Sequence, residues 1–127
     1  GTIYRELDAR FGLSRPEFVI LYTLSRRPGL VARDVCLATG LPKNSISRSV
    51  AALVRRGLVE RATDTGDRRA KPLTMTAEGD DLLVRILPLF EARQEAMLAA
   101  LSPQERRDWD RLLAKLIGAM PDWVGPE

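Results

Sequence analysis

The 127-residue sequence contains no histidine and only one cysteine, Cys36. Without histidine the chain lacks the usual general base, the commonest metal ligand and the group that activates serine or cysteine nucleophiles. A lone cysteine excludes an intramolecular disulfide framework and a multi-cysteine metal site, and it suits a reducing cytoplasm. An enzyme is therefore the least favoured class of function, and we expect neither a cofactor nor a metal.

Long apolar runs are also missing from the sequence. No run approaches the roughly 18 residues that a membrane-spanning helix needs. The chain does not begin with a charged and then apolar leader either. We therefore expect a cytoplasmic protein with no membrane partner.

Apolar residues make up 45% of the chain, which is enough for a hydrophobic core in one domain of this length. The net charge is only +3, but the charges are unevenly distributed. Residues 43–71 carry eight Lys/Arg and three Asp/Glu, whereas residues 72–127 carry six and ten. The middle of the chain is thus the part that would attract a polyanion.

Two helices are predicted at the start of the chain. Residues 2–11 have apolar side chains at helical spacing, and Gly12 ends that helix. Residues 13–27 form a second helix that is apolar on most sides and should therefore lie centrally. Ser14 and Glu17 have the spacing of a capping box at its start.

A short helix and a longer helix then follow one another across a tight turn. Residues 31–40 predict the short helix, which buries Val35, Cys36 and Thr39. Pro42 can occupy the first position of the next helix, where its missing N–H costs nothing. That helix covers residues 43–56. The order is typical of a helix-turn-helix motif, and the apolar side of the longer helix consists of Ile46, Val50, Leu53 and Val54.

Two short strands should follow as a hairpin. Residues 58–63 and 70–76 alternate in polarity on either side of "DTGD". Pro72 should confine its strand to the edge of a sheet, because proline donates no backbone hydrogen bond.

The last part of the chain predicts two more helices. Residues 76–101 form a long helix with Thr76 as its cap, and Pro88 should kink or break it. Ser102 and Glu105 form a second capping box at the start of the final helix. The apolar side of that helix consists of Trp109, Leu112, Leu113, Leu116 and Ile117.

The polar side of helix 43–56 carries the chemistry that we single out. Short polar side chains in the first turns let a helix approach base edges closely, and arginine can pair bidentately with guanine. Further cationic side chains suit phosphates, among them Arg56. A solvated surface helix is the competing interpretation, but the clustered positive charge and the adjoining hairpin favour nucleic acid. The expected contacts are Lys43, Asn44, Ser45, Ser47, Arg48 and Arg55.

The hairpin would then act as a wing beside this helix. Arginine is attracted into a narrow minor groove, where the negative potential is enhanced. Asp67 would orient Arg69 or Arg68, because a carboxylate near phosphates is repelled. The expected wing residues are Asp67, Arg68, Arg69 and Lys71.

The succession "LATGLPKNSISRSVAALVRRGLVERATDTGDRRAKPLTMTAEG" resembles the core of the MarR-type winged helix-turn-helix regulators. The passages that carry the resemblance are "SRSVAALVRRGLVER", "DRR" and "LTMTAEG". The resemblance extends over nearly the whole chain, because the flanking helices correspond in order and length. The sequence departs from the family at Pro42, where a serine-type cap is frequent, and at Pro88, which interrupts the long helix.

The resemblance implies a mostly α (α+β) fold in one MarR-like domain over residues 1–127. A winged helix-turn-helix lobe would cover residues 14–76, and a long connecting helix residues 77–101. Residues 1–13 and 102–127 would be dimerisation helices. The interface residues implied are Ile3, Leu7, Trp109, Leu112, Leu113, Leu116 and Ile117.

The resemblance also implies a function. Members of this family are homodimeric, cytoplasmic bacterial transcription factors that bind double-stranded DNA at a pseudo-palindromic operator, and many are repressors released by a small aromatic effector. By position, residues 43–56 correspond to the recognition helix and Arg69 to the wing arginine, with Asp67 as its partner.

Two alternatives stay open at the level of sequence. A winged helix can serve as a protein-protein interaction module whose helix and wing dock on an acidic partner without binding DNA. Cys36 can be a redox sensor, as thiols are in some members of the family, although inert packing between the two helices of the motif is favoured.

Overall fold

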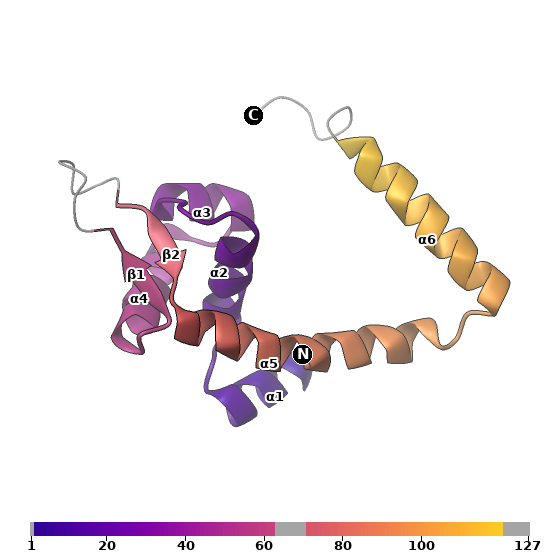
Figure 1. Cartoon of the computed structure of the whole chain (residues 1–127), viewed down its shortest axis with the longest axis horizontal. Coiled ribbons are helices and arrows are strands. Elements are labelled where there is room, and N and C mark those ends of the chain that lie inside the picture. Colours follow the sequence, from indigo (N-terminus) through magenta and orange to yellow (C-terminus); the bar gives the residue numbers. More distant parts are fainter. Residues whose placement is uncertain (1, 63–70, 121–127) are drawn as a thin grey trace. The chain divides into compact units, whose positions relative to one another are not determined.

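The computed structural model of the chain describes residues 2–62 and 71–120 (Figure 1). These residues form six helices and two short strands, which confirms the predicted mostly helical α+β architecture. Within these ranges, no helix has the length and apolar character needed to cross a membrane. In chain order the elements are α1 (Thr2–Phe11), α2 (Arg15–Arg26), α3 (Ala32–Thr39), α4 (Lys43–Arg55), β1 (Val59–Arg61), β2 (Leu73–Met75), α5 (Ala77–Leu98) and α6 (Pro103–Gly118).

The chain divides between Leu89 and Phe90 into two compact units. Unit 1 (Gly1–Leu89) contains α1 to α4, both strands and the first part of α5. Unit 2 (Phe90–Glu127) contains the rest of α5 and α6. The assignment of residues 1–13 and 102–127 to dimerisation, around a lobe of residues 14–76, stays a prediction.

Helix α2 is the centre of unit 1, as its apolar sequence predicts. It packs against α3, α4 and β2, and its residues Ile20 and Leu21 have no exposed surface. Burying a side chain of this size stabilises the fold by about 1.5–3 kcal/mol. The helix begins at the predicted capping box: the Glu17 N–H donates to Ser14 Oγ at 3.3 Å, and the Ser14 N–H donates to Glu17 Oε1 at 2.8 Å.

Helix α4 begins at the predicted residue, Lys43, but Pro42 has another place at its start than the one predicted. Pro42 is the N-cap of α4 and not its first helical residue, because its ψ of 147° is extended. The Pro42 carbonyl still accepts the first helical hydrogen bond, from the Ile46 N–H at 3.0 Å. Proline has no side-chain oxygen that could accept a hydrogen bond from the first N–H groups of the helix, so α4 begins without a side-chain cap.

Helices α1 and α4 are each followed closely by a glycine, and the end of α1 before Gly12 is as predicted. Gly12 follows α1 with φ of 66°, and Gly57 follows α4 with φ of 73°. Only glycine takes this left-handed conformation without steric cost, so each residue lets the chain turn sharply into the next element.

The two strands form an antiparallel ribbon shorter than predicted. Val59 pairs with Met75, Glu60 with Thr74 and Arg61 with Leu73. Pro72 lies just before β2, so its missing N–H does not weaken the ladder. The outer side of β2 is not a bare edge: Leu73 exchanges backbone hydrogen bonds with the Gly29–Leu30 segment, at 3.0 and 2.9 Å.

Of the kink or break predicted at Pro88, the break does not occur, because α5 is one continuous helix through this residue. A proline inside a helix leaves the carbonyl four residues earlier, here that of Val84, without its partner. Val84 and Pro88 are both exposed. A carbonyl on the solvent side can bond to water, which explains why the helix continues.

Helix α6 begins at the second predicted capping box. The Glu105 N–H donates to Ser102 Oγ at 3.2 Å, and the Ser102 N–H donates to Glu105 Oε1 at 2.9 Å. Within unit 2, Arg106 of α6 donates to both carboxylate oxygens of Glu95 in α5, at 2.7 and 3.3 Å.

Candidate nucleic-acid interface

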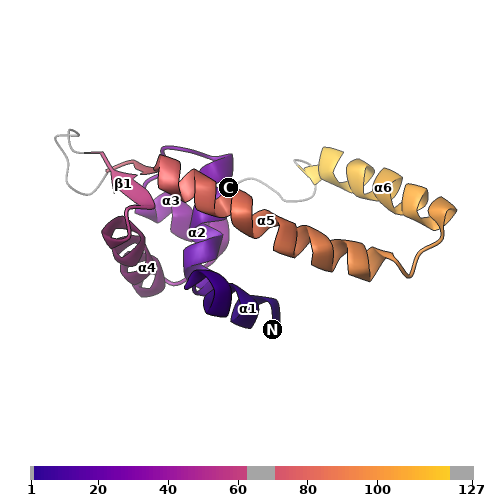
Figure 2. The same cartoon turned by 60° about the horizontal axis from the view of Figure 1, so that its bottom comes forward.

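One side of α4 is fixed in the core of unit 1. Ile46, Val50 and Leu53 are buried, as predicted, and the helix packs against α2 and α3. Ser49 is also buried, although it was not predicted. Its spacing of three residues from Ile46 and four from Leu53 is the signal that could have placed it there. Figure 2 shows α4 along the outside of the unit, directly before β1.

The opposite side of α4 is available to a partner. Among the predicted contact residues, only Ser45 is half-buried, and the others are exposed. Within the described residues, their side chains form no ion pair with the rest of the chain. The exposed members are Lys43, Asn44, Ser47, Arg48 and Arg55.

The groove between α3 and α4 adds a residue that sequence reasoning missed. Arg33 of α3 lines an open pocket together with Lys43 and Ser47 of α4. Arg33 is exposed at the first turn of its helix. Nothing in the local sequence pattern pairs it with Lys43, because the two residues belong to different helices. Two cations therefore flank the start of the predicted recognition helix.

Cys36 lies at this groove and is less buried than expected. Val35 of α3 is fully buried, but Cys36 and Thr39 are only half-buried. The prediction that α3 buries all three residues is thus wrong for two of them. The reason is that the short helix turns only its Val35 face to the core, and Cys36 faces the pocket between the helices.

The predicted wing position is confirmed only at its base. Strands β1 and β2 follow α4 directly, so a two-stranded ribbon stands next to the predicted recognition helix. Asp67, Arg68 and Arg69 lie outside the described residues. Lys71 is described, and it is half-buried.

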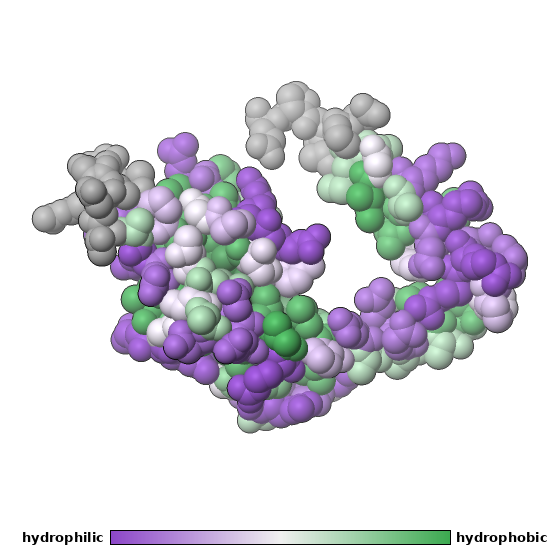
Figure 3. Space-filling model, viewed as in Figure 1, coloured by the Kyte–Doolittle hydropathy of each residue, from purple (hydrophilic) through white to green (hydrophobic). Residues whose placement is uncertain are grey.

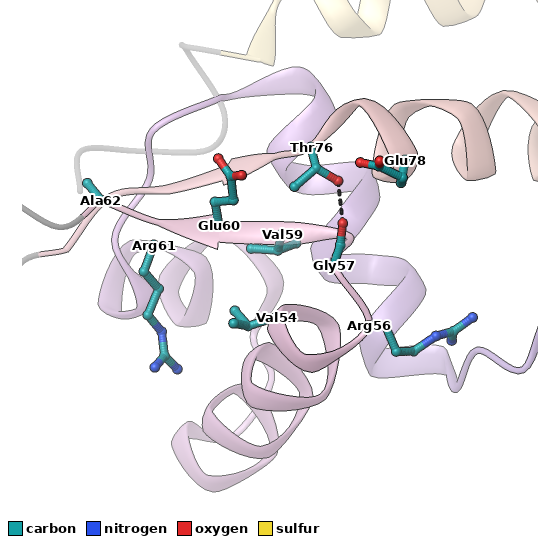
Figure 4. Close-up of a pocket in the computed structure, with 9 residues that line it drawn as sticks. All are labelled: Val54, Arg56, Gly57, Val59, Glu60, Arg61, Ala62, Thr76 and Glu78. Atoms are coloured by element: carbon teal, nitrogen blue, oxygen red, sulfur yellow. Dashed lines mark hydrogen bonds between the residues drawn. The ribbon is translucent and has the colours of Figure 1, made fainter.

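The segment that joins α4 to β1 is held by α5. Thr76 Oγ1 donates to the Gly57 carbonyl at 2.6 Å (Figure 4), and the Thr76 N–H donates to the Leu58 carbonyl at 3.1 Å. Thr76 Oγ1 also accepts from the Gly79 N–H at 3.0 Å, which is the cap predicted for the long helix. The same side chain therefore starts α5 and fixes the end of the predicted recognition helix.

An open pocket adjoins this junction, but its charged side chains do not converge. Glu60 and Arg61 are neighbours on β1 and point to opposite faces of the strand, and Arg56 points away from both (Figure 4). In this view the acidic and the basic side chains do not point to a common position in the pocket. We therefore assign no ligand to this pocket.

The sequence position of Arg56 predicts that it adds positive charge to the surface of α4 for phosphates, but in the structure its guanidinium bonds elsewhere in the chain. Its guanidinium donates to the carbonyls of Gly12 at 2.9 Å and Phe11 at 3.1 Å. These partners are more than 40 residues away in the sequence, so no local pattern could have predicted them.

The residues predicted for a dimer interface fall into two groups. In α1, Leu7 has no exposed surface in the single chain, so it belongs to the core of its own chain, and Ile3 is half-buried. In α6, the predicted apolar residues are exposed, and Figure 3 shows hydrophobic side chains along one side of this helix and hydrophilic ones along the other. The exposed residues are Trp109, Leu112, Leu113, Leu116 and Ile117.

Comparison with known proteins supports the same assignment. Residues 11–70 match the sequence profile of the MarR family. The HTH-type transcriptional repressor Rv2887 of Mycobacterium tuberculosis is 31% identical over 105 residues, which cover 83% of this chain and 76% of that protein. The transcriptional regulator HosA of Escherichia coli is 27% identical over 105 residues, which cover 83% of this chain and 78% of HosA.

Solved structures agree with the sequence relatives. The Mycobacterium tuberculosis MarR family protein Rv2887, in complex with salicylic acid, superposes with a TM-score of 0.72 at 30% identity, covering 90% of this chain and 84% of that one. The PcaV regulator of Streptomyces coelicolor, in complex with its natural ligand, gives a TM-score of 0.68 at 27% identity, covering 93% and 85%. The chain therefore belongs to the MarR family and is a winged helix-turn-helix transcriptional regulator, not an enzyme.

Proposed function

We propose that the protein is a cytoplasmic repressor that binds double-stranded DNA as a symmetric homodimer, with α4 in the major groove. The observation that carries this proposal is the two-sided character of α4: one side is fixed in the core and the other presents exposed polar and cationic side chains. The short side chains of Asn44 and Ser47 let the helix approach base edges closely, and Arg48 can pair with guanine. The positive charges of Lys43 and Arg55 suit phosphates. Ser45 is half-buried, which leaves it a smaller part of the contact surface.

The wing completes the proposed interface. The ribbon of β1 and β2 follows α4 directly, and we propose that the segment between the two strands contacts the neighbouring minor groove or backbone. We assign this contact to Arg69, oriented by Asp67, with Arg68 and Lys71 adding positive charge. This assignment rests on the sequence and the family resemblance.

The apolar side of α6 supports a homodimer. A single chain leaves a row of large apolar side chains exposed there, including Trp109 at 41% and Leu112 at 48%. Contiguous exposed apolar surface of this kind marks an interaction site. Two-fold symmetry would present two copies of α4 to successive major grooves, so the operator should be a pseudo-palindrome with half-sites about 10 base pairs apart.

A small aromatic acid is the effector class that we propose. One relative was solved with salicylic acid bound, and another with its natural ligand. If such a compound binds this protein, it should raise the melting temperature and weaken operator binding. Salicylic acid is the first probe to use, with benzyl alcohol as a neutral control.

Selection of binding sequences from a random duplex pool tests the proposal. We expect a pseudo-palindromic sequence to be enriched. Arg48→Ala should lose about 1–3 kcal/mol of discrimination at particular base pairs. Arg111→Ala, on α6, is the matched control and should select the same sequence as the parent protein. If Arg48→Ala also selects that sequence with unchanged affinity, α4 does not read the bases.

A further inference from the structure

Arg56 joins the end of α4 to the end of α1. It is the C-cap residue of α4, and its Nη1 and Nη2 atoms donate to the carbonyls of Gly12 and Phe11 at 2.9 and 3.1 Å. Phe11 is the last residue of α1. The guanidinium therefore caps the C-terminus of α1 through two carbonyls, which belong to residues 44 and 45 positions earlier in the chain.

The chemistry of this contact favours a cation at this place. The last carbonyls of a helix have no partner within the helix, and they form the negative end of its dipole. The planar guanidinium can donate to two acceptors at once, in a fixed geometry that a lysine ammonium cannot reproduce. Gly12 is in the left-handed conformation, with φ of 66°, which sets the direction of the chain at this point.

A second arginine contacts the same corner of the molecule. The guanidinium of Arg85, in α5, lies 5.7 Å from the centre of the Phe11 ring, and that of Arg10 lies 5.4 Å from it. Both distances are within the range of a cation-π interaction. The end of α1 thus meets α4 through its carbonyls and α5 through its ring, all within unit 1.

The segment that follows Arg56, residues 57–58, is also held in place, by Thr76. Thr76 bonds the Gly57 carbonyl through its side chain and the Leu58 carbonyl through its N–H. The end of α4 is therefore held between α1 and the first turn of α5. Figure 4 shows Arg56 at the start of this segment, directed away from the strands, and Thr76 bonded to Gly57 from the opposite side.

We propose that Arg56 is a positioning residue, which sets the placement of the recognition helix relative to α1 and thereby the spacing between the two recognition helices of the dimer. This inference rests on the proposed function, in which α4 reads DNA and the protein is a homodimer, and on the predicted assignment of residues 1–13 to dimerisation. It replaces the expectation that Arg56 supplies charge to a phosphate. Its consequence is that Arg56 controls which half-site spacing the protein prefers.

Arg56→Lys separates the positioning role of Arg56 from the supply of charge to a phosphate. Lysine keeps the positive charge but cannot bond both carbonyls in the same geometry. Affinity would be measured by fluorescence anisotropy on operators whose half-sites are moved closer or further apart by one base pair, and over a series of salt concentrations. We expect affinity for the best operator to fall about tenfold, because two charge-assisted hydrogen bonds that hold α4 are removed. The preference among spacings should flatten, and the salt slope should stay unchanged.

Arg55→Ala is the matched comparison, since Arg55 is exposed on the same turn. It should lower the salt slope by about 0.9 for each phosphate that the variant no longer neutralises. Arg56→Gln is the second variant, should Arg56→Lys fail to fold. It removes the charge and should flatten the spacing preference while keeping the salt slope.

Two results would overturn the positioning role. One is Arg56→Lys binding with the affinity and spacing preference of the parent, while Arg56→Gln lowers the salt slope as Arg55→Ala does. The other is a loss of affinity with the spacing preference intact. Failure of the proposed function is a distinct outcome, because the parent protein itself would then bind no operator.

Discussion

At the scale of single residues, Gly79 shows how closely α5 approaches the end of α4. A Cβ atom built on Gly79 would lie 2.3 Å from the Leu58 carbonyl oxygen and 3.2 Å from the carbonyl carbon. Both atoms belong to the backbone, so no flexible side chain can move aside. The glycine of the "TAEG" passage is therefore required for packing, although its own backbone conformation does not require glycine.

Gly79→Ala should accordingly destabilise the protein. Forcing a methyl group into this contact must shift α5 or the 57–58 segment, at a cost of about 1–3 kcal/mol. Gly118→Ala is the control, because a Cβ there has open space, and alanine favours a helix over glycine by about 0.5–1 kcal/mol. Urea unfolding at one protomer concentration measures both. Equal stabilities for the two variants would contradict the close approach.

The sequence predicted which side chains of α4 are exposed, apart from the half-buried Ser45, but it could not predict the partners of Arg56. Exposure follows from helical periodicity, so Lys43, Asn44 and Arg48 could be placed from the pattern of their own segment. The partners of Arg56 are backbone carbonyls of another helix, and a carbonyl leaves no trace in a sequence pattern. Leu7 was assigned to an interface by the family resemblance, and the sequence pattern could not correct this, because periodicity shows which side of a helix is apolar but not whether its own chain or a partner covers it.

At the scale of elements, local signals were sufficient for the helix starts. Both capping boxes, at Ser14 and Ser102, lie within four consecutive residues and form as predicted. The structural effect of Pro88 was predicted less well, because it depends on whether the carbonyl left unpaired by the proline faces solvent or the core. Pro88 does not break α5, since the carbonyl that it leaves unpaired is on an exposed side.

The contact between α5 and α6 within unit 2 should depend on pH. The Arg106 guanidinium that bonds to Glu95 lowers the pKa of this carboxyl below its ordinary value. A lowered pKa in the folded state means that the pair stabilises at neutral pH, and that this contribution disappears as the pH falls through the folded pKa. The change should therefore occur below the ordinary glutamate range, at less than about pH 4.3.

Glu95→Gln provides the measurement of this pH dependence. The variant cannot form the ion pair, so the parent should melt at a higher temperature than Glu95→Gln at pH 7. The difference should be small, because the pair is exposed, and it should shrink as the pH is lowered below about 4.3. A difference that stays constant or grows in acid would contradict the pairing.

At the scale of the whole molecule, the apolar side of α6 sets the predicted assembly state. Within the described residues this helix buries none of its own side chains in the single chain, yet it carries five exposed large apolar residues at helical spacing. We expect Leu112→Asp to produce a monomer, because it places a charge in the proposed interface. Leu37→Asp is the control, since Leu37 is 76% exposed on α3, and it should remain dimeric. Sedimentation velocity distinguishes the two, and a dimeric Leu112→Asp would exclude this side of α6.

The affinity for random-sequence duplex DNA as a function of salt concentration tests the central proposal that α4 and its ribbon face the double helix. We predict measurable affinity that falls steeply with salt, with a slope of about 0.9 for each phosphate contacted, and a smaller slope for Arg55→Ala. Absent binding, or an affinity that does not change with salt, would instead indicate a module that docks on other proteins.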